Sequence, residues 1–141
     1  MARQAEAEWK GDLKSGSGRV KLGSGAYEGN YSFATRFENG SGANPEELLG
    51  AAHAGCFSMA LANSLATAGF TATSVHTNAD VHLGKDDKGF LINLIELTVT
   101  ADVPNVDSAT FQQHVEKTKV GCIISRALAS VPMTVKATLK Q

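Results

Sequence analysis

The chain contains two cysteines, and their surroundings in the sequence differ. Cys56 lies in a long run of residues without any Asp, Glu, Lys or Arg, and Cys122 lies in a second segment of helical character. A single buried thiol is usually a small, inert hydrophobic residue. Two thiols on two core helices, with Arg36 on a predicted strand and Glu46 at a predicted helix start, instead indicate redox catalysis.

A cysteine acts as a nucleophile in its thiolate form, and near a pKa of 8.5 only about 3% of a free thiol is ionised at pH 7. Lowering that pKa to about 7 takes roughly 2 kcal/mol of preferential stabilisation of the anion. Cys56 lies too far along its predicted helix for the helix dipole to help, and burial opposes ionisation. A cation must therefore approach Cys56. Arg36 is the best candidate if Glu46 orients its guanidinium; the alternative is that Arg36 is a solvated edge charge.

His53 lies one helical turn before Cys56 and is a candidate base. The preferred interpretation is a core histidine that is satisfied by a backbone carbonyl. A zinc site built from His53 and both cysteines is disfavoured, because the chain has no close ligand pair of the C-x-x-C kind. We therefore expect no metal and no cofactor. A solvated strand face is predicted to carry His76, Asp80 and His82.

Length and composition predict one domain over residues 1–141 with a single core. A hydrophobic content of 43% with 19% charged residues indicates a soluble globular protein and excludes a disordered or fibrous chain. The formal charge of −1 gives no electrostatic reason to expect nucleic acid or an anionic membrane as a partner. The first six residues have no apolar signal-peptide core, so a cytoplasmic location is expected. In that reducing compartment, two cysteines favour catalysis or redox sensing over a structural disulfide.

Alternating and helical patterns predict an α+β chain with the order βββ-α-ββ-α-β. The first helix is predicted to begin after an N-cap at Asn44 and to end before Gly69. The second is predicted to begin at Asp107 or the residue after it and to continue through Cys122, with Pro132 ending that segment. The predicted strands cover residues 6–10, 19–22, 31–37, 73–83, 90–102 and 133–139.

The uncharged segment over residues 48–70 is long enough to cross a membrane, but its glycines and polar residues make it too polar for a span. A helix without a charged face is instead covered by protein on all sides. Six short strands form about one layer, which covers one side of this helix only. Small residues such as Gly50, Ala54 and Gly55 would let a second helix come close. The sequence therefore predicts a homodimer that wraps two sheets around paired central helices.

Three segments of the chain resemble the OsmC/Ohr family. They are residues 33–38 (FATRFE), 44–61 (NPEELLGAAHAGCFSMAL) and 119–122 (KVGC). Residues 9–12 (WKGD) are similar to the OsmC branch rather than to the Ohr branch. Members of this family are thiol peroxidases that reduce organic hydroperoxides. The resemblance therefore implies an OsmC-like fold, an intertwined homodimer and peroxidase activity.

Carried over to this chain, the resemblance makes Cys56 the peroxidatic and Cys122 the resolving cysteine. Arg36 matches the family's arginine, and Glu46 matches the glutamate that pairs with it. Cys56 would become a sulfenic acid, and Cys122 would condense with it to a disulfide. An external dithiol, such as a lipoylated protein, would restore both thiols. Where the family often has proline after the second cysteine, this chain has Ile123.

Two other functions remain open from the residues. One is a redox sensor, or a hydroperoxide- or lipid-binding dimer, whose cysteine is oxidised without turnover. The other is a structural or small-ligand-binding dimer in which both thiols are inert. For the enzyme, apolar surroundings of Cys56 that include Phe33, Phe37 and Phe57 predict a preference for bulky alkyl hydroperoxides over hydrogen peroxide.

The spacing between Glu46 and Cys56 sets a geometric problem. Ten residues of one straight helix span about 15 Å, which is more than one arginine side chain can bridge. Arg36 therefore cannot readily contact Glu46 and Cys56 of the same chain. Either the helix is broken near Gly50, or the ion pair is assembled across the dimer from a partner chain's residues. The second arrangement is the expected one, because the covered helix already requires a partner.

Overall fold

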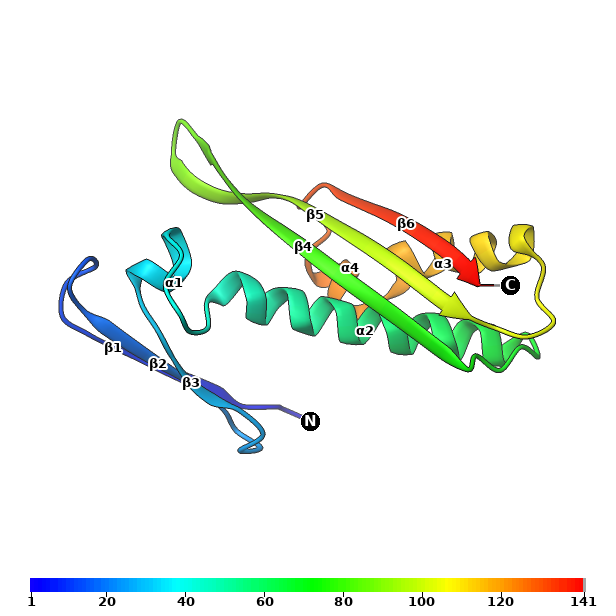
Figure 1. Cartoon of the computed structure of the whole chain (residues 1–141), viewed down its shortest axis with the longest axis horizontal. Helices are drawn as coiled ribbons and strands as arrows, with labels where there is room; N and C mark the ends of the chain where they lie inside the picture. The colour runs from blue at the N-terminus through cyan, green and yellow to red at the C-terminus, as the bar shows by residue number, and fades with distance from the viewer. Residues whose placement is uncertain (141) are drawn as a thin grey trace. The chain divides into compact units, whose positions relative to one another are not determined.

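The computed structural model describes residues 1–140, and the chain divides into two compact units, Met1–Leu48 and Leu49–Gln141. Each unit contains its own three-stranded sheet (Figure 1). The prediction of about one layer of strands was therefore wrong, because the six strands do not form one sheet. The α+β class is confirmed, and the observed order is βββ-α-α-ββ-α-α-β.

The sheet of the first unit is an antiparallel meander of β1 (Ala5–Lys10), β2 (Ser17–Leu22) and β3 (Glu28–Tyr31). The rings of Trp9 and Tyr31 pack on each other with centroids 5.4 Å apart, which fixes the pairing at one end. The predicted strands over residues 6–10 and 19–22 are confirmed.

The predicted strand over residues 31–37 is wrong beyond Tyr31, because Phe33–Phe37 form a short helix, α1. Ser32 and Thr35 close a capping box: Thr35 N–H donates to Ser32 Oγ (3.2 Å), and Ser32 N–H donates to Thr35 Oγ1 (2.8 Å). Phe33 and Phe37, read as alternate positions of a strand, are four residues apart on one helix face, where their centroids lie 5.0 Å apart. The capping hydrogen bonds favour a helix here over the strand that the alternating pattern predicts.

Helix α2 (Pro45–Thr67) runs without interruption through Gly50. Asn44 caps it as predicted, since its Oδ1 accepts a hydrogen bond from Glu47 N–H at 2.8 Å. Gly69, at a φ of 96°, follows the end of the helix. Within residues 1–140, α2 is the one helix long and apolar enough to cross a membrane, a property that core helices of soluble proteins share.

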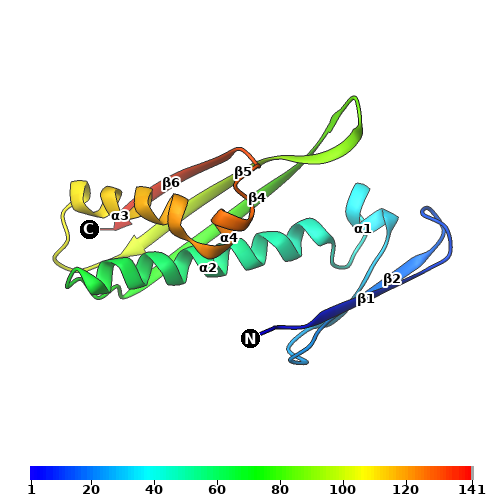
Figure 2. The same cartoon turned by 180° about the vertical axis from the view of Figure 1, so that it is seen from behind.

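The sheet of the second unit joins β4 (Ser74–Asp86) and β5 (Gly89–Asp102) as a hairpin, and β6 (Met133–Lys140) lies parallel to β5. The connection from β5 to β6 contains α3 (Ser108–Gly121) and α4 (Ile123–Ala127). Helices α2, α3 and α4 lie on one face of this sheet (Figures 1 and 2). The strands predicted over residues 73–83, 90–102 and 133–139 are confirmed.

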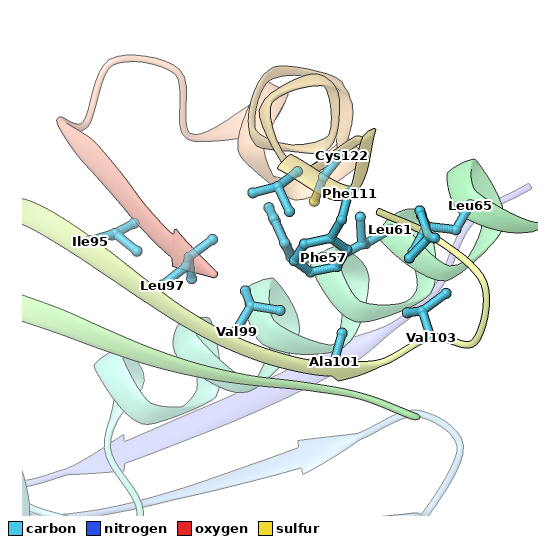
Figure 3. Close-up of a cluster of buried hydrophobic side chains, with 12 residues drawn as sticks. Phe57, Leu61, Leu65, Ile95, Leu97, Val99, Ala101, Val103, Phe111 and Cys122 are labelled. Carbon is cyan, nitrogen blue, oxygen red and sulfur yellow. The ribbon is translucent and has the colours of Figure 1, made fainter. Parts of the chain in front are cut away.

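The core of the second unit lies between α2, α3 and the central strand β5 (Figure 3). From α2 it receives Phe57, Leu61 and Leu65, which recur every four residues and are fully buried. Alternate residues of β5 face them: Ile95, Leu97, Val99 and Ala101. Cys122 belongs to the same cluster, so one of the two thiols is a core side chain.

One side of α2 is not covered within the single chain. Ala52 and Gly55 are exposed, and Met59 is 76% exposed. These residues form an uncharged stripe along one side of the helix, and a Cβ added at Gly55 would meet no atom within 4 Å. Val120 and Ile123, near Cys122, are 72% and 75% exposed. The single chain thus leaves a continuous helix with an apolar, small-residue face open to solvent.

Candidate active site

Cys122 lies in the break between two helices. It ends α3, where its N–H donates to the Thr118 carbonyl at 3.0 Å, and it is the N-cap residue of α4. Its ψ of 135° is extended rather than helical. The prediction of a helix continuing through Cys122 was therefore wrong. The predicted start of that helix is confirmed, since Asp107 Oδ1 accepts from Thr110 N–H at 2.7 Å.

The break brings the two cysteines together. The Sγ atoms of Cys56 and Cys122 lie 3.0 Å apart, share a hydrogen bond and are both free thiols. Cys56 is half-buried on α2, whereas Cys122 is 2% exposed. A disulfide bond is about 2.05 Å long, so closing one requires the sulfurs to approach by about 1 Å. Two sulfurs 66 residues apart in sequence are thus held in position for reversible oxidation.

The two thiols titrate as a pair. Burial raises the pKa of Cys56, and its hydrogen bond with Cys122 raises it further, while the backbone N–H groups of Ile124 and Ile123 act in the opposite direction. Burial also opposes ionisation of Cys122, but its hydrogen bonds with Cys56 and Ser125 lower the pKa of Cys122 overall. Within the single chain, the contact between the two sulfurs therefore opposes ionisation of Cys56 and favours ionisation of Cys122.

His53 is fully buried on α2, and its Nε2 lies 2.9 Å from the hydroxyl oxygen of Ser125, the third residue of α4. The expectation that a backbone carbonyl satisfies this ring was wrong: a hydroxyl on another helix does so. Nδ1 of His53 is buried without a hydrogen-bond partner among the described residues. Burial lowers the pKa of His53, so the ring is neutral at pH 7.

Arg36 lies on α1, not on a strand as predicted, and it is bound to Glu46 of the same chain. Its Nη2 donates to Glu46 Oε1 at 2.8 Å, and its Nε donates to both carboxylate oxygens at 3.1 and 3.2 Å. The side chain of Arg36 is 39% exposed and that of Glu46 is 11% exposed. The expectation that this ion pair is assembled from two chains, or over a broken helix, was wrong. Ser32 and Thr35 cap α1 and thereby set the start of the helix that carries Arg36.

Two other candidates take different positions from those expected. Phe57 is fully buried in the core, so it cannot line a substrate pocket, and that expectation was wrong. His76, Asp80 and His82 are exposed on β4 as predicted, and His82 Nε2 lies 2.6 Å from Glu96 Oε2. Within residues 1–140, no group of three or more His, Cys, Asp and Glu side chains is placed to hold a metal ion.

Ser125 is the site residue that the sequence analysis missed. It lies three residues after Cys122 and is 4% exposed. Ser125 carried no recognisable sequence signal, because the start of α4 has no side-chain capping hydrogen bond. Its hydroxyl connects α4 to His53 on α2, one turn before Cys56.

Several known proteins are similar to this chain. The family model described as OsmC-like protein matches residues 38–136. Peroxiredoxin OsmC of Escherichia coli (strain K12) is 50% identical over 127 residues, which cover 89% of this chain and 89% of that protein. The range matched by the family model contains Glu46, His53, Cys56 and Cys122.

Solved structures show the same fold. An organic hydroperoxide resistance protein from Elizabethkingia anophelis has 25% identity and a TM-score of 0.70, and the match covers 100% of this chain and 98% of that chain. An OsmC-like protein from Mycoplasma pneumoniae has 18% identity and a TM-score of 0.75, with coverage of 100% and 99%. Because the family model spans most of the sequence and half of the aligned residues are identical to those of a peroxiredoxin OsmC, this chain belongs to the OsmC family.

Proposed function

We propose that this chain is a thiol-dependent peroxidase that reduces organic hydroperoxides to alcohols through a Cys56 sulfenic acid and a Cys56–Cys122 disulfide. The chain is a peroxide-reducing enzyme, since it is 50% identical to a peroxiredoxin over 89% of both sequences. The observation that supports the two-cysteine mechanism is the 3.0 Å separation of the two sulfurs. A sulfenic acid formed on either sulfur would have a thiol within reach.

The reaction balances in three steps. The Cys56 thiolate attacks the terminal oxygen of the hydroperoxide, the O–O bond breaks, and the alkoxide leaves and takes a proton to become the alcohol. The Cys122 thiol then attacks the sulfenic sulfur of Cys56, which forms the disulfide and releases water. An external dithiol reduces this disulfide by two successive exchanges and is itself oxidised to a disulfide.

Cys56 is the proposed site of attack because it is the more exposed of the two cysteines. Its raised pKa in the single chain means that a cation must shift the negative charge toward it. We assign this role to Arg36, whose guanidinium is oriented by a fork of hydrogen bonds to Glu46. A cation that is fixed in this way loses little side-chain freedom when the thiolate forms.

The Arg36–Glu46 pair of one chain is proposed to serve Cys56 of a second chain in a homodimer. Helix α2 is unbroken, so Glu46 and Cys56 are about 15 Å apart along it, too far for one arginine to bridge. The open apolar stripe of α2 (Ala52, Gly55 and Met59) is a suitable contact for a second copy. In this assembly the two compact units act as a single OsmC-like domain, whose sheets wrap around the paired helices.

The function is tested by measuring how much peroxide the protein consumes. With dithiothreitol and an excess of cumene hydroperoxide, an enzyme consumes many equivalents per chain. A sensor stops after one equivalent, and an inert dimer keeps both thiols titratable. Consumption of one equivalent or less would contradict the proposal.

A protein with Cys122 replaced by serine is expected to react once with peroxide and then to stop, without turnover. The Cys56 sulfenic acid then has no thiol beside it, so it persists or is oxidised further to sulfinic acid. Mass spectrometry of the intact chain after one equivalent of peroxide should show a gain of one or two oxygens at Cys56. Normal turnover with dithiothreitol would show that Cys122 is not the resolving cysteine.

Alkyl hydroperoxides are expected to react at least about tenfold more efficiently than hydrogen peroxide. Burying roughly 100 Å² of alkyl surface is worth about 2.5 kcal/mol before the costs of binding, and hydrogen peroxide gains none of it. The ring of Phe33, which packs at a tilt against Phe37 on α1, is the proposed apolar wall. The ratio of kcat/KM for cumene hydroperoxide and hydrogen peroxide measures this preference. Phe33→Ala should lower it by acting on the alkyl substrate alone, and an unchanged ratio would contradict the role of Phe33.

The proposed partners are a second copy of the chain, an organic hydroperoxide and a dithiol reductant such as a lipoylated protein. The proposed location is the cytoplasm, where a pool of reduced dithiols sustains turnover.

A further inference from the structure

His53 and Ser125 form a buried polar contact beside the two sulfurs that the proposed peroxidase steps leave without a role. His53 is fully buried and Ser125 is 4% exposed, and their Nε2 and Oγ atoms lie 2.9 Å apart. Burying two polar side chains in a core is costly unless each finds a partner. Their contact links α2, one turn before Cys56, to α4, three residues after Cys122. It therefore spans the same two segments as the thiol pair.

The unpartnered ring nitrogen fixes the direction of this hydrogen bond. Nδ1 of His53 is buried without a partner among residues 1–140. A buried N–H without an acceptor is rarer and more costly than an unused lone pair. The proton of the neutral ring therefore lies on Nε2, which donates to Ser125 Oγ. The Ser125 hydroxyl is then left to donate its own proton elsewhere.

Two sulfur atoms compete for that proton. Ser125 Oγ donates to Met133 Sδ at 3.6 Å, and Ser125 also hydrogen bonds to Cys122, which lowers the pKa of Cys122. A thioether is a weak acceptor, whereas a thiolate is a strong one. The hydroxyl can rotate between them, so it stabilises Cys122 most when that sulfur is charged.

We propose that His53 and Ser125 are positioning residues for the reductive half-reaction, in which they stabilise Cys122 as the departing thiolate when a dithiol attacks Cys56. This inference rests on the proposed two-cysteine cycle. The dithiol attacks Cys56 in this inference because Cys56 is half-buried, whereas Cys122 is 2% exposed.

Reduction of the disulfide takes two successive thiol–disulfide exchanges. A thiolate of the dithiol bonds to Cys56 Sγ, the bond between Cys56 and Cys122 breaks, and its electron pair leaves on Cys122 Sγ. The Ser125 hydroxyl turns from Met133 Sδ to this new anion while His53 Nε2–H continues to donate to Ser125. The second thiol of the dithiol then attacks the mixed disulfide, which releases Cys56 as thiolate. Exchange is faster when the departing thiol has a lower pKa.

The test measures reduction separately from oxidation. The full-length disulfide is prepared with diamide, an oxidant that does not require peroxidase chemistry, and its reduction by dithiothreitol is followed by rapid quenching and alkylation. Ser125→Ala is expected to slow reduction about tenfold, the usual effect of losing a hydrogen bond to a charged group. Ser125→Thr keeps a hydroxyl and should retain a rate near that of the wild type. His53→Phe should resemble Ser125→Ala, whereas His53→Gln, with an amide donor, should recover part of the rate.

Two further readouts separate positioning from a general structural role. Sulfenic acid formation at Cys56 should change less than about twofold in Ser125→Ala, because this step does not involve Cys122 as a leaving group. In the Cys56→Ser background, the thiolate absorbance of Cys122 should titrate about one pH unit higher when Ser125 is replaced by alanine. Equal slowing of both half-reactions, or an unchanged Cys122 titration, would overturn the inference. Failure of peroxide oxidation in the wild type would instead overturn the proposed function.

Discussion

Replacing Cys56 with serine is expected to lower peroxide turnover at least about a thousandfold, to the rate of the uncatalysed reaction. A serine hydroxyl is a far weaker nucleophile than a thiolate and cannot form the sulfenic acid. The remaining thiol, Cys122, is 2% exposed, so a bulky hydroperoxide cannot reach it without rearrangement of the core. The measurement is consumption of cumene hydroperoxide in the presence of dithiothreitol.

The matched control for this variant is Cys122→Ser, which removes the other sulfur of the same pair. Both variants lose turnover, but only Cys122→Ser should consume the first equivalent of peroxide. Serine is nearly isosteric with cysteine, so circular dichroism should report an unchanged fold in both. A Cys56→Ser protein that still consumes one equivalent would make Cys122 the peroxidatic residue. The lower pKa of Cys122 in the single chain makes this a meaningful alternative.

Mixing two inactive variants is expected to restore activity if the site is shared between chains. Arg36→Ala leaves Cys56 without its cation, so the thiolate fraction of Cys56 at pH 7 falls and peroxide turnover is lost. In a heterodimer of Arg36→Ala and Cys56→Ser chains, one site combines an intact Cys56 with an intact Arg36. With random pairing, half of the dimers are mixed, so about a quarter of wild-type activity should return.

A site within one chain gives a different result. Each Cys56 would then keep the Arg36 of its own chain, and mixing would only average the two variants. Differently tagged chains allow the heterodimer to be purified and its formation verified. Glu46→Gln in place of Arg36→Ala should give the same complementation, because the carboxylate orients the guanidinium. If purified heterodimers remain as inactive as their parents, Arg36 does not serve the partner's cysteine.

The long elements could be predicted from the sequence because several signals agree there. For α2, Asn44 at the N-cap and Gly69 after the end coincide with an uncharged run of helical length. For β4 and β5, alternation extends over more than ten residues on each side of a short turn. Where the period of the hydrophobic pattern, the helix caps and the turn residues agree, few other secondary structures fit the sequence.

The short elements could not be predicted in the same way. Residues 31–37 alternate like a strand, and the capping box of Ser32 and Thr35 is visible in the sequence only if a helix of five residues is considered. At Cys122, the helical spacing of neighbouring apolar residues hides an extended residue between α3 and α4. Both segments whose structure was predicted wrongly carry site residues. Arg36 lies on the short helix α1, and the break between α3 and α4 positions Cys122.

The sequence named the candidate site residues but not their geometry. Residue types and the family resemblance both pointed to Cys56, Cys122, Arg36 and Glu46, and two of the pairs among them are in contact in the single chain. Residue types cannot reveal whether the Arg36 and the Cys56 of one site come from the same chain, because that depends on whether α2 is continuous. The contact between His53 and Ser125 joins residues 72 apart in sequence and is specified only by packing.

The parallel pairing of β5 with β6 has a consequence for biosynthesis. Parallel neighbours need a crossover, and Cys122 lies within this one, 66 residues after Cys56. On the ribosome, Cys56 emerges well before its partner, and the crossover is anchored at both ends only when β6 has been translated and has added to the sheet. A nascent chain therefore exposes Cys56 as a solitary thiol, and premature oxidation at this stage has no neighbouring sulfur to reverse it. Reducing conditions during translation are thus part of what this topology requires.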